Sequence, residues 1–288
     1  MKGMKRRAKI APYCFIAPFF IIFSYFYFVP VFKVIMDSFT DYDMFTKRNF
    51  VGLKNYMELM KDEIFIISVG NTFFYTVCML FPALIIGLLL ACLIGSSLVK
   101  TKYTRMAIFI PHVISMVAIS MIWLYIYEPG SGVLNQMLRN LHMRERKWLF
   151  EPQIALLCLA VMGIWKSVGY YMVVFLSGLK GISQQYYEAA QIDGSGPVNT
   201  FFHITLPLLK PTTTFLLITG IISSFNVFEQ VNIMTKGGPL NRTTTMVHQI
   251  YIAGFTEYKL GYASAMSVVL LLIVIGISAL NFGLAGKE

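Results

Sequence analysis

Six long apolar runs dominate this chain and limit what it can fold into. A helix of about 20 apolar residues crosses the hydrocarbon layer of a bilayer, because each residue adds about 1.5 Å. The first run is too long for a signal-peptide core and lacks a clear small-residue cleavage site, so we expect it to stay as a membrane helix. The sequence therefore predicts an all-α integral membrane protein with six transmembrane helices. The runs cover residues 13–35, 69–94, 107–127, 154–176, 212–234 and 263–282.

Composition agrees with this class. Only 13% of the residues are charged, whereas soluble domains carry about 25%. The net charge of +10 comes from basic residues at the ends of apolar runs, where lipid headgroups lie, rather than from a nucleic-acid surface. The four cysteines lie inside apolar runs and the four histidines are scattered, which argues against a disulfide framework or a zinc site.

The polar segments between the runs predict the organisation of the chain. Six crossings place both termini on one side of the membrane. Lys and Arg are tied at eleven on each side, but their density beside the first helix favours cytoplasmic termini. The expected parts are a basic tail at 1–10, a first transmembrane helix at 11–36, an external loop at 37–63, a membrane core at 64–284 with a cytoplasmic loop at 178–211, and a C-terminal tail at 285–288.

The loop at 178–211, which we call the finger, has the pattern of two short helices around a tight turn. Residues 184–192 contain no Gly or Pro, so they predict the first helix. Gly194 and Gly196 should end it, because glycine accepts the left-handed conformation of a C-cap. Pro197 suits the first turn of a second helix, which Pro207 and the following Pro211 should stop or redirect.

The finger resembles the EAA loop of ABC-importer permeases at every fixed position of that pattern. In that family the loop is a cytoplasmic coupling helix that docks into a groove on a separate ATPase subunit. The resemblance therefore implies the type I ABC-importer permease fold and an ATPase-coupling role for the matching residues. These are Glu188, Ala189, Ala190, Gly194, Ile204, Leu206 and Pro207.

Four further stretches resemble carbohydrate-type ABC permeases, of the maltose, glycerol-3-phosphate and lactose kind. Residues 50–56 match the F-V-G-L-x-N-Y signature, which implies a small external helix on the membrane surface. Asn71-Thr72, residues 225–229 and residues 235–239 also match. Family permeases often have Asp where Glu229 stands, and this departure puts the fit at that position in doubt.

Polar and aromatic residues in the fourth and fifth runs are candidates for a substrate path. Polar groups inside membrane spans usually face a bundle interior or a path, and sugars bind to planar polar groups and aromatic rings. We expect Asn226 and Glu229, three residues apart, to share a helix face. Ordinary packing or interface anchoring is the alternative for each residue taken singly. The candidates are Trp165, Tyr170, Tyr171, Asn226 and Glu229.

The resemblance implies a non-catalytic subunit of a sugar importer in a prokaryotic cytoplasmic membrane. The chain has no G-x-x-x-x-G-K-[ST] motif, so we expect no cofactor in it, and ATP and Mg on the partner ATPase. The implied partners are a second homologous permease, two ATP-binding cassette subunits and an extracellular or periplasmic solute-binding protein. Two alternatives are a proton-coupled secondary transporter using Glu229 and, less well supported, an intramembrane enzyme.

Overall fold

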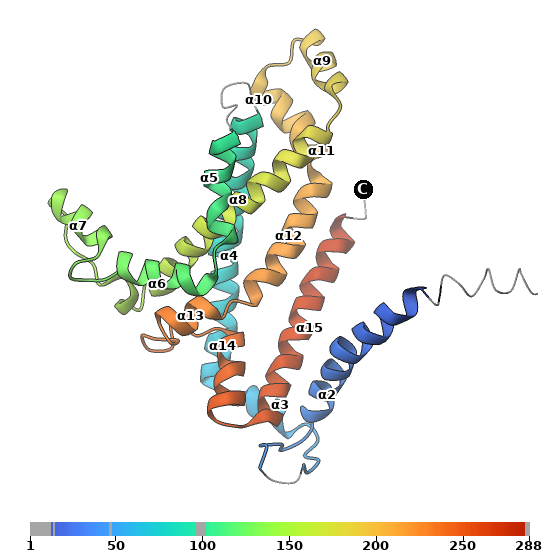
Figure 1. Cartoon of the computed structure of the whole chain (residues 1–288), viewed down its shortest axis with the longest axis vertical. Coiled ribbons are helices and arrows are strands. Elements are labelled where there is room, and N and C mark those ends of the chain that lie inside the picture. The colour runs from blue at the N-terminus through green and yellow to red at the C-terminus, as the bar shows by residue number, and fades with distance from the viewer. Residues whose placement is uncertain (1–12, 14, 46–47, 96–101, 286–288) are drawn as a thin grey trace, which may run out of the picture. The chain divides into compact units, whose positions relative to one another are not determined.

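The computed structural model describes residues 13, 15–45, 48–95 and 102–285 (Figure 1). The basic tail at 1–10, Cys14 and residues 286–288 of the C-terminal tail lie outside these described residues. Regular structure in the described part is helical, apart from one isolated bridge between Thr40 and Phe50. The predicted all-α class is therefore confirmed.

The apolar runs form helices that are long enough for a membrane. Within the described residues, five helical segments meet the length and composition of a membrane span. A sixth span results if α5 (Lys102–Val113) and α6 (Met116–Ile126) count as one bent pair. The five are Phe15–Asp37, Glu63–Gly95, Ala155–Gly181, Lys210–Met234 and Leu260–Asn281.

The third run is not the continuous span that we expected over residues 107–127. Helices α5 and α6 meet there at an angle of 97°. Pro111 lies inside α5 and has no backbone N–H to complete the helical ladder. The next helix restarts at Ser115, whose extended backbone (φ −53°, ψ 137°) forms the N-cap of α6. Pro111 weakens the last turn of α5, and the chain begins a new helix after Ser115. The third run is therefore a broken span.

The fifth run is also interrupted. Helix α12 (Lys210–Phe225) ends before α13 (Glu229–Met234) begins. Asn226 is the C-cap of α12, and its Nδ2 donates to the carbonyl of Ile222 at 2.8 Å. Such local side-chain bonds compete with a helix ladder. The expectation that Asn226 and Glu229 share one helix face is therefore wrong.

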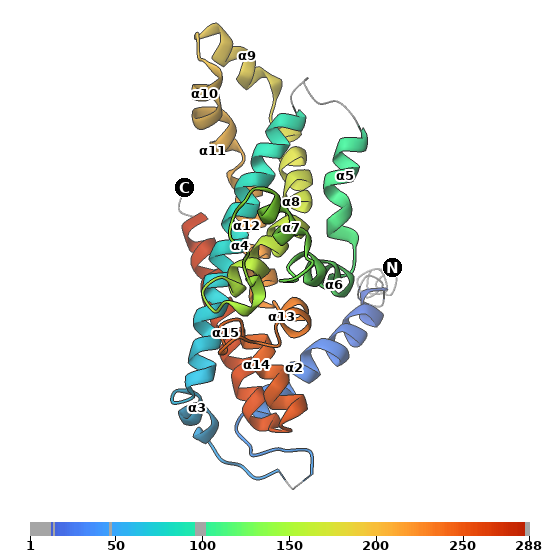
Figure 2. The same cartoon turned by 90° about the vertical axis from the view of Figure 1, so that its left-hand side faces the viewer.

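The chain divides into two compact units, and the described residues of the larger are 63–95, 102–249 and 272–285. In this unit α4 (Glu63–Gly95) and α5 both pack against α8 (Ala155–Gly181), and α12 packs against α4 (Figures 1 and 2). A Cβ added at Gly87 of α4 would lie 2.6 Å from the Cβ of Tyr171. Glycine is thus needed there for the close approach of two membrane helices.

The larger unit also contains the polar connections α7 (Val133–Asn140) and part of α14 (Met246–Tyr251). Asn71 Nδ2 on α4 donates to the carbonyls of Asn241 and Thr244, each at 2.9 Å. The neighbouring Thr72 Oγ1 accepts the backbone N–H of Met246 at 3.0 Å. These contacts fix the loop that precedes α14 to α4, and they give the Asn71-Thr72 signature a structural reason.

The described residues of the smaller unit are 13, 15–45, 48–62 and 250–271. It includes α2 (Val29–Asp37), α3 (Lys54–Leu59) and the first part of α15 (Leu260–Ala285). Asn55 of α3 is buried, and its Nδ2 donates to the carbonyls of Ser38 and Thr40 at 2.8 and 2.9 Å. The short helix expected from the F-V-G-L-x-N-Y stretch is confirmed, and its asparagine holds the preceding loop.

Candidate functional site

The first half of the finger is α9 (Gln184–Ile192), which begins and ends at the residues that the sequence predicted. Gly194 follows it with φ +72°, the left-handed conformation expected of a C-cap glycine. The N–H of Gly194 donates to the carbonyl of Gln191 at 3.1 Å, and the N–H of Ser195 donates to the carbonyl of Ala190 at 2.8 Å. This pair of bonds is the Schellman motif, which satisfies the last carbonyls of the helix.

The second half of the finger begins at Gly196, which is extended (φ −74°, ψ 165°) and caps α10 (Pro197–Thr200). The left-handed role expected for Gly196 is therefore wrong, and the glycine acts as an N-cap instead. A π-helical turn (Phe201–Thr205) and α11 (Leu206–Leu208) continue the chain towards α12. Pro207 lies in the first turn of α11, and Pro211 lies in the first turn of α12. The two prolines therefore redirect the chain without ending its helical path.

The two halves of the finger contact each other through small polar groups. The hydroxyl of Tyr187 lies 3.3 Å from Thr205 Oγ1, and Asn199 Nδ2 donates to Ser195 Oγ at 2.9 Å. Ala190 is only 5% exposed, which places one of the two motif alanines against the rest of the finger. The finger is therefore a folded hairpin with one inner and one outer surface.

The motif residues differ in exposure. Glu188, Ala189, Gly194 and Pro207 are exposed, whereas Ile204 and Leu206 are half-buried. A Cβ at Gly194 would meet nothing within 4 Å, so this side of the turn is open to an approaching surface.

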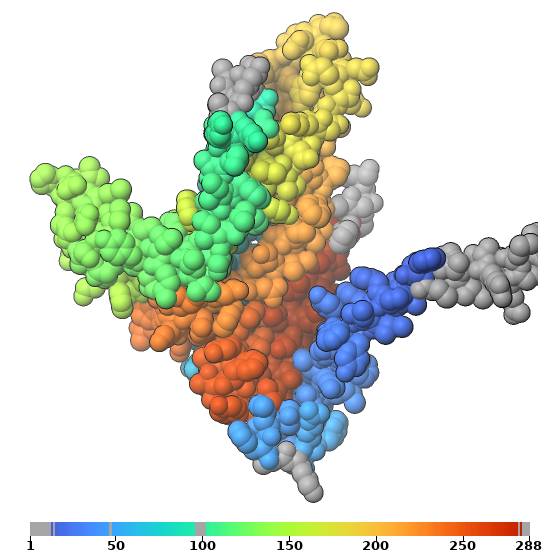
Figure 3. Space-filling view, viewed as in Figure 1, coloured from blue at the N-terminus to red at the C-terminus, as the bar shows by residue number. Residues whose placement is uncertain are grey.

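The finger also exposes several large apolar side chains outside the EAA motif. Ile192, Val198 and Phe202 are 86%, 71% and 57% exposed. We call these three residues the apolar tip. In Figure 3 the finger, in yellow, projects beyond α5 at one end of the larger unit. Apolar residues on either side of a polar turn are the sequence signal for these side chains.

The second candidate region lies at the break between α5 and α6. Lys166 Nζ on α8 donates to the carbonyl oxygens of Ile114 at 2.6 Å, His112 at 3.1 Å and Pro111 at 3.4 Å. These carbonyls are among those that a helix end leaves without an intrahelical partner. Lys166 therefore holds the end of α5 and stabilises the bend.

Two of the predicted path residues lie beside this break. Trp165 is 43% exposed and meets Trp123 edge to face, with ring centroids 5.8 Å apart. The ring of Tyr170 stacks on His112 at 4.9 Å. The sequence reading missed His112 and Trp123 as neighbours; a break after Pro111 was the signal that could have placed them.

The other path candidates occupy different surroundings. Tyr171 is only 3% exposed and is packed between membrane helices. Asn226 is exposed beyond the end of α12, and Glu229 is exposed at the start of α13. Glu229 begins α13, which packs against α6, the helix that follows the break. The structure thus brings Trp165, Tyr170 and Glu229 towards one region and leaves Tyr171 in the packed interior.

No group of three or more His, Cys, Asp or Glu residues in the described ranges is arranged to hold a metal ion. The finger presents an open turn beside exposed apolar side chains, and the break presents aromatic rings beside an acid and a base.

Comparison with known proteins places these features in a family. Residues 65–285 match the family described as binding-protein-dependent transport system inner membrane component. The chain is 33% identical to the probable ABC transporter permease protein YurN of Bacillus subtilis, over 99% of this chain and 100% of that protein. It is 32% identical to the arabinooligosaccharides transport system permease protein AraP of the same organism, over 97% and 90%. It is 30% identical to the sn-glycerol-3-phosphate transport system permease protein UgpA of Yersinia pestis, over 94% and 92%.

Solved structures show the same fold. A chain of a bacterial alginate ABC transporter, in complex with an alginate pentasaccharide-bound periplasmic protein, matches with a TM-score of 0.86 and 24% identity. The match covers 99% of this chain and 96% of that chain. The MetNI methionine ABC transporter matches with a TM-score of 0.52 and 16% identity, over 81% and 97%. From the helices, the finger and these likenesses, the chain belongs to the binding-protein-dependent inner membrane components, the permeases of ABC importers.

Proposed function

We propose that this chain is one permease subunit of an importer for a sugar, or for a related polyol or sugar phosphate, driven by ATP hydrolysis on a separate subunit. The observation that carries the proposal is the finger, a folded hairpin that leaves an open glycine turn and an apolar tip uncovered. Exposed large apolar side chains that gather on a projecting segment are typical of a protein interface. The partner ATPase would supply the ATP and Mg sites.

In the coupling role, each residue that matches the EAA motif has a proposed contact or supporting function. Gly194 lets a partner backbone approach, because no side chain occupies the space beside it. Glu188 is exposed and free to pair with a basic group of the partner. Ala189 keeps the adjacent face flat, and the half-buried Ile204 and Leu206 with Pro207 support the second half of the finger.

The coupling role is tested by charging the apolar tip. Ile192→Glu combined with Val198→Glu should abolish copurification of the ATPase and ATP-driven uptake into proteoliposomes, because burying two carboxylates in an apolar groove is costly. Leu141→Glu is the matched control, since Leu141 is 68% exposed but lies outside the finger. Normal uptake by the double variant would reject this docking surface.

The solute class rests on the relatives and on the groups at the α5–α6 break. Relatives are named for arabinooligosaccharides and sn-glycerol-3-phosphate, and a matching structure comes from an alginate transporter. Trp165 and Tyr170 supply rings and Glu229 an acceptor, the mixture suited to hydroxylated molecules. Trp165→Ala should raise the KM for uptake more than it lowers the maximal rate. An unchanged KM would remove Trp165 from the path, and Asn226→Ala tests the more distant candidate in the same assay.

The remaining partners follow from the same proposal. We expect a second, homologous permease, two ATP-binding cassette subunits and an external solute-binding protein, in a prokaryotic cytoplasmic membrane with both termini inside.

Orientation is tested with single cysteines in a cysteine-free background. Tyr186→Cys on the finger should resist an impermeant thiol reagent in intact cells, whereas Leu141→Cys should react. Labelling of Tyr186→Cys in intact cells would overturn the orientation. Neither the family nor the geometry favours a proton-coupled transporter using Glu229.

A further inference from the structure

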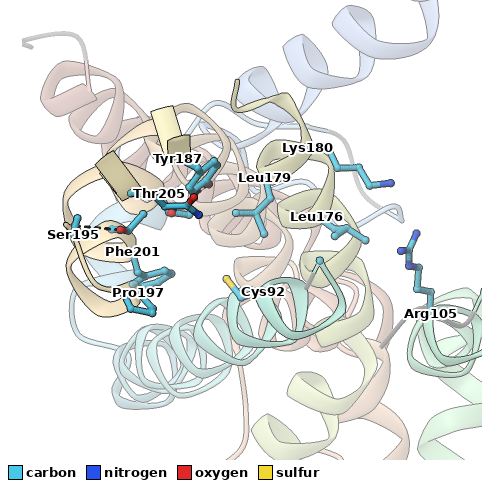
Figure 4. A pocket seen from close by; sticks show the side chains of 13 residues that line it. Cys92, Arg105, Leu176, Leu179, Lys180, Tyr187, Ser195, Pro197, Phe201 and Thr205 are labelled. Carbon is cyan, nitrogen blue, oxygen red and sulfur yellow. Dashed lines mark hydrogen bonds between the residues drawn. The ribbon is translucent and has the colours of Figure 1, made fainter. Parts of the chain in front are cut away.

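A cavity of about 750 Å³ lies between the finger and the ends of three membrane helices (Figure 4). Its walls come from the last turns of α4 and α8, the first turn of α5, and the inner surface of the finger. The volume falls within the range of about 300–1,000 Å³ that is usual for small-molecule sites. Neither the docking of the finger nor the substrate path proposed above assigns a ligand to this cavity.

Two cations stand at one side of the cavity. Figure 4 shows Arg105 of α5 and Lys180 of α8 on the same side, opposite Ser195 and Pro197. None of the described residues that line the cavity is acidic. The Nε of Arg105 is buried and has no hydrogen-bond partner among the described residues. A buried guanidinium N–H without an acceptor is unfavourable, so the geometry calls for an anionic or strongly accepting ligand.

The rest of the lining suits a ligand that is polar at one end and apolar at the other. Leu176, Leu179 and Phe201 supply apolar surface, and Ser195 and Thr200 supply hydroxyl groups on the finger side. Arg105 and Lys180 lie in the terminal turns of helices at the ends of membrane spans, which is where lipid headgroups are found. Basic pockets between membrane helices at this depth suit phosphate groups.

We propose that this cavity is a binding site for an anionic phosphate group, held by Arg105 and Lys180. An occupant would touch the helix ends and the finger together, so its presence would restrain the finger relative to α8. The same chemistry is carried by the headgroup of an anionic phospholipid and by a soluble phosphate, and the experiment separates these two sources.

The test uses the full chain, assembled with its transporter subunits, in phosphatidylcholine nanodiscs. Binding is measured in two arms, by adding phosphatidylglycerol to the nanodisc or inorganic phosphate to the buffer. Arg105→Gln and Lys180→Gln should each weaken binding about tenfold or more, the loss expected for one charge-assisted hydrogen bond. Lys102→Gln is the matched control, because Lys102 shares the first turn of α5 but does not line the cavity.

The outcomes are distinct. Variant-sensitive binding in the lipid arm alone identifies a phospholipid site, and variant-sensitive binding in the phosphate arm alone identifies a soluble ligand. Lys180 is exposed, so its substitution tests the site even if Arg105→Gln impairs folding. Equal binding by wild type, Lys180→Gln and Lys102→Gln in both arms, or no binding in either, would overturn the proposal. Because binding is measured without transport, failure here leaves the coupling role of the finger untouched.

Discussion

The glycine turn of the finger allows a quantitative test of how this hairpin is held. Gly194 has φ +72°, and a Cβ added there meets nothing within 4 Å. Gly194→Ala therefore adds no clash, and its whole cost comes from placing an L-residue in the left-handed region, about 1–2 kcal/mol. Gly196 has φ −74° and equally open surroundings. Gly196→Ala should be neutral or should stabilise the turn by about 0.4–1 kcal/mol, through loss of unfolded-state freedom.

Amide hydrogen exchange measures this difference directly. The amides of residue 194 and Ser195 donate to the carbonyls of Gln191 and Ala190, so they exchange when the Schellman turn opens. Gly194→Ala should speed their exchange about five- to thirtyfold, the factor that corresponds to 1–2 kcal/mol. Gly196→Ala should leave it unchanged or slow it. Equal effects of the two substitutions would refute the assignment of strain to Gly194.

Three further predictions concern other contacts. Lys166→Met removes the donor to three carbonyls at the α5–α6 break and should cost about 3 kcal/mol, seen as a lower Tm, with partial recovery in Lys166→Arg. Asn55→Ala leaves two carbonyls of the preceding loop without their donor, should cost about 1–3 kcal/mol, and should speed limited proteolysis around residues 38–40. Hydrogen bonds from Asn49 lower the pKa of Asp41 below its ordinary value. The contact should therefore stabilise the loop, and protect it against limited proteolysis, above a pH of about 4. Protection should be lost as pH falls through the lowered pKa, and Asp41→Asn should flatten that dependence; a variant with the wild-type pH profile would contradict it.

The finger shows how much of this fold local sequence signals can predict. Helix α9 was predicted residue for residue, because the Gly-containing turn and Pro197 are signals that act within a few residues. The membrane helices were predictable for a similar reason, since a span must satisfy its own backbone within lipid. The prediction that Gly196 adopts the left-handed conformation was wrong. Two glycines near a helix end offer two positions for the left-handed residue, and the residue types alone do not distinguish them.

The breaks in the third and fifth runs were not predictable in the same way. Pro111 marks this region in the sequence, but the α5–α6 bend is also held by Lys166, which is more than fifty residues further along the chain and donates to carbonyls at the break. The interruption after α12 contains neither Gly nor Pro, and it is accompanied by a side-chain bond from Asn226 to its own helix. The burial of Tyr171 likewise follows from the close approach that Gly87 permits. The α5–α6 bend and the burial of Tyr171 therefore depend on contacts between distant segments, whereas the bond beside the interruption after α12 is local.

The helical path that leaves the finger has a mechanical consequence. From Pro197 through Phe225 the chain passes from α10 to α12 with every junction in right-handed helical geometry, and the turn at Leu209 is fully buried. At about 1.5 Å per residue such a path measures roughly 40 Å, comparable to the thickness of a bilayer with its headgroups. If the finger docks as proposed, a displacement of α10 would be transmitted along this path towards Phe225, because each junction between its helices keeps right-handed helical geometry.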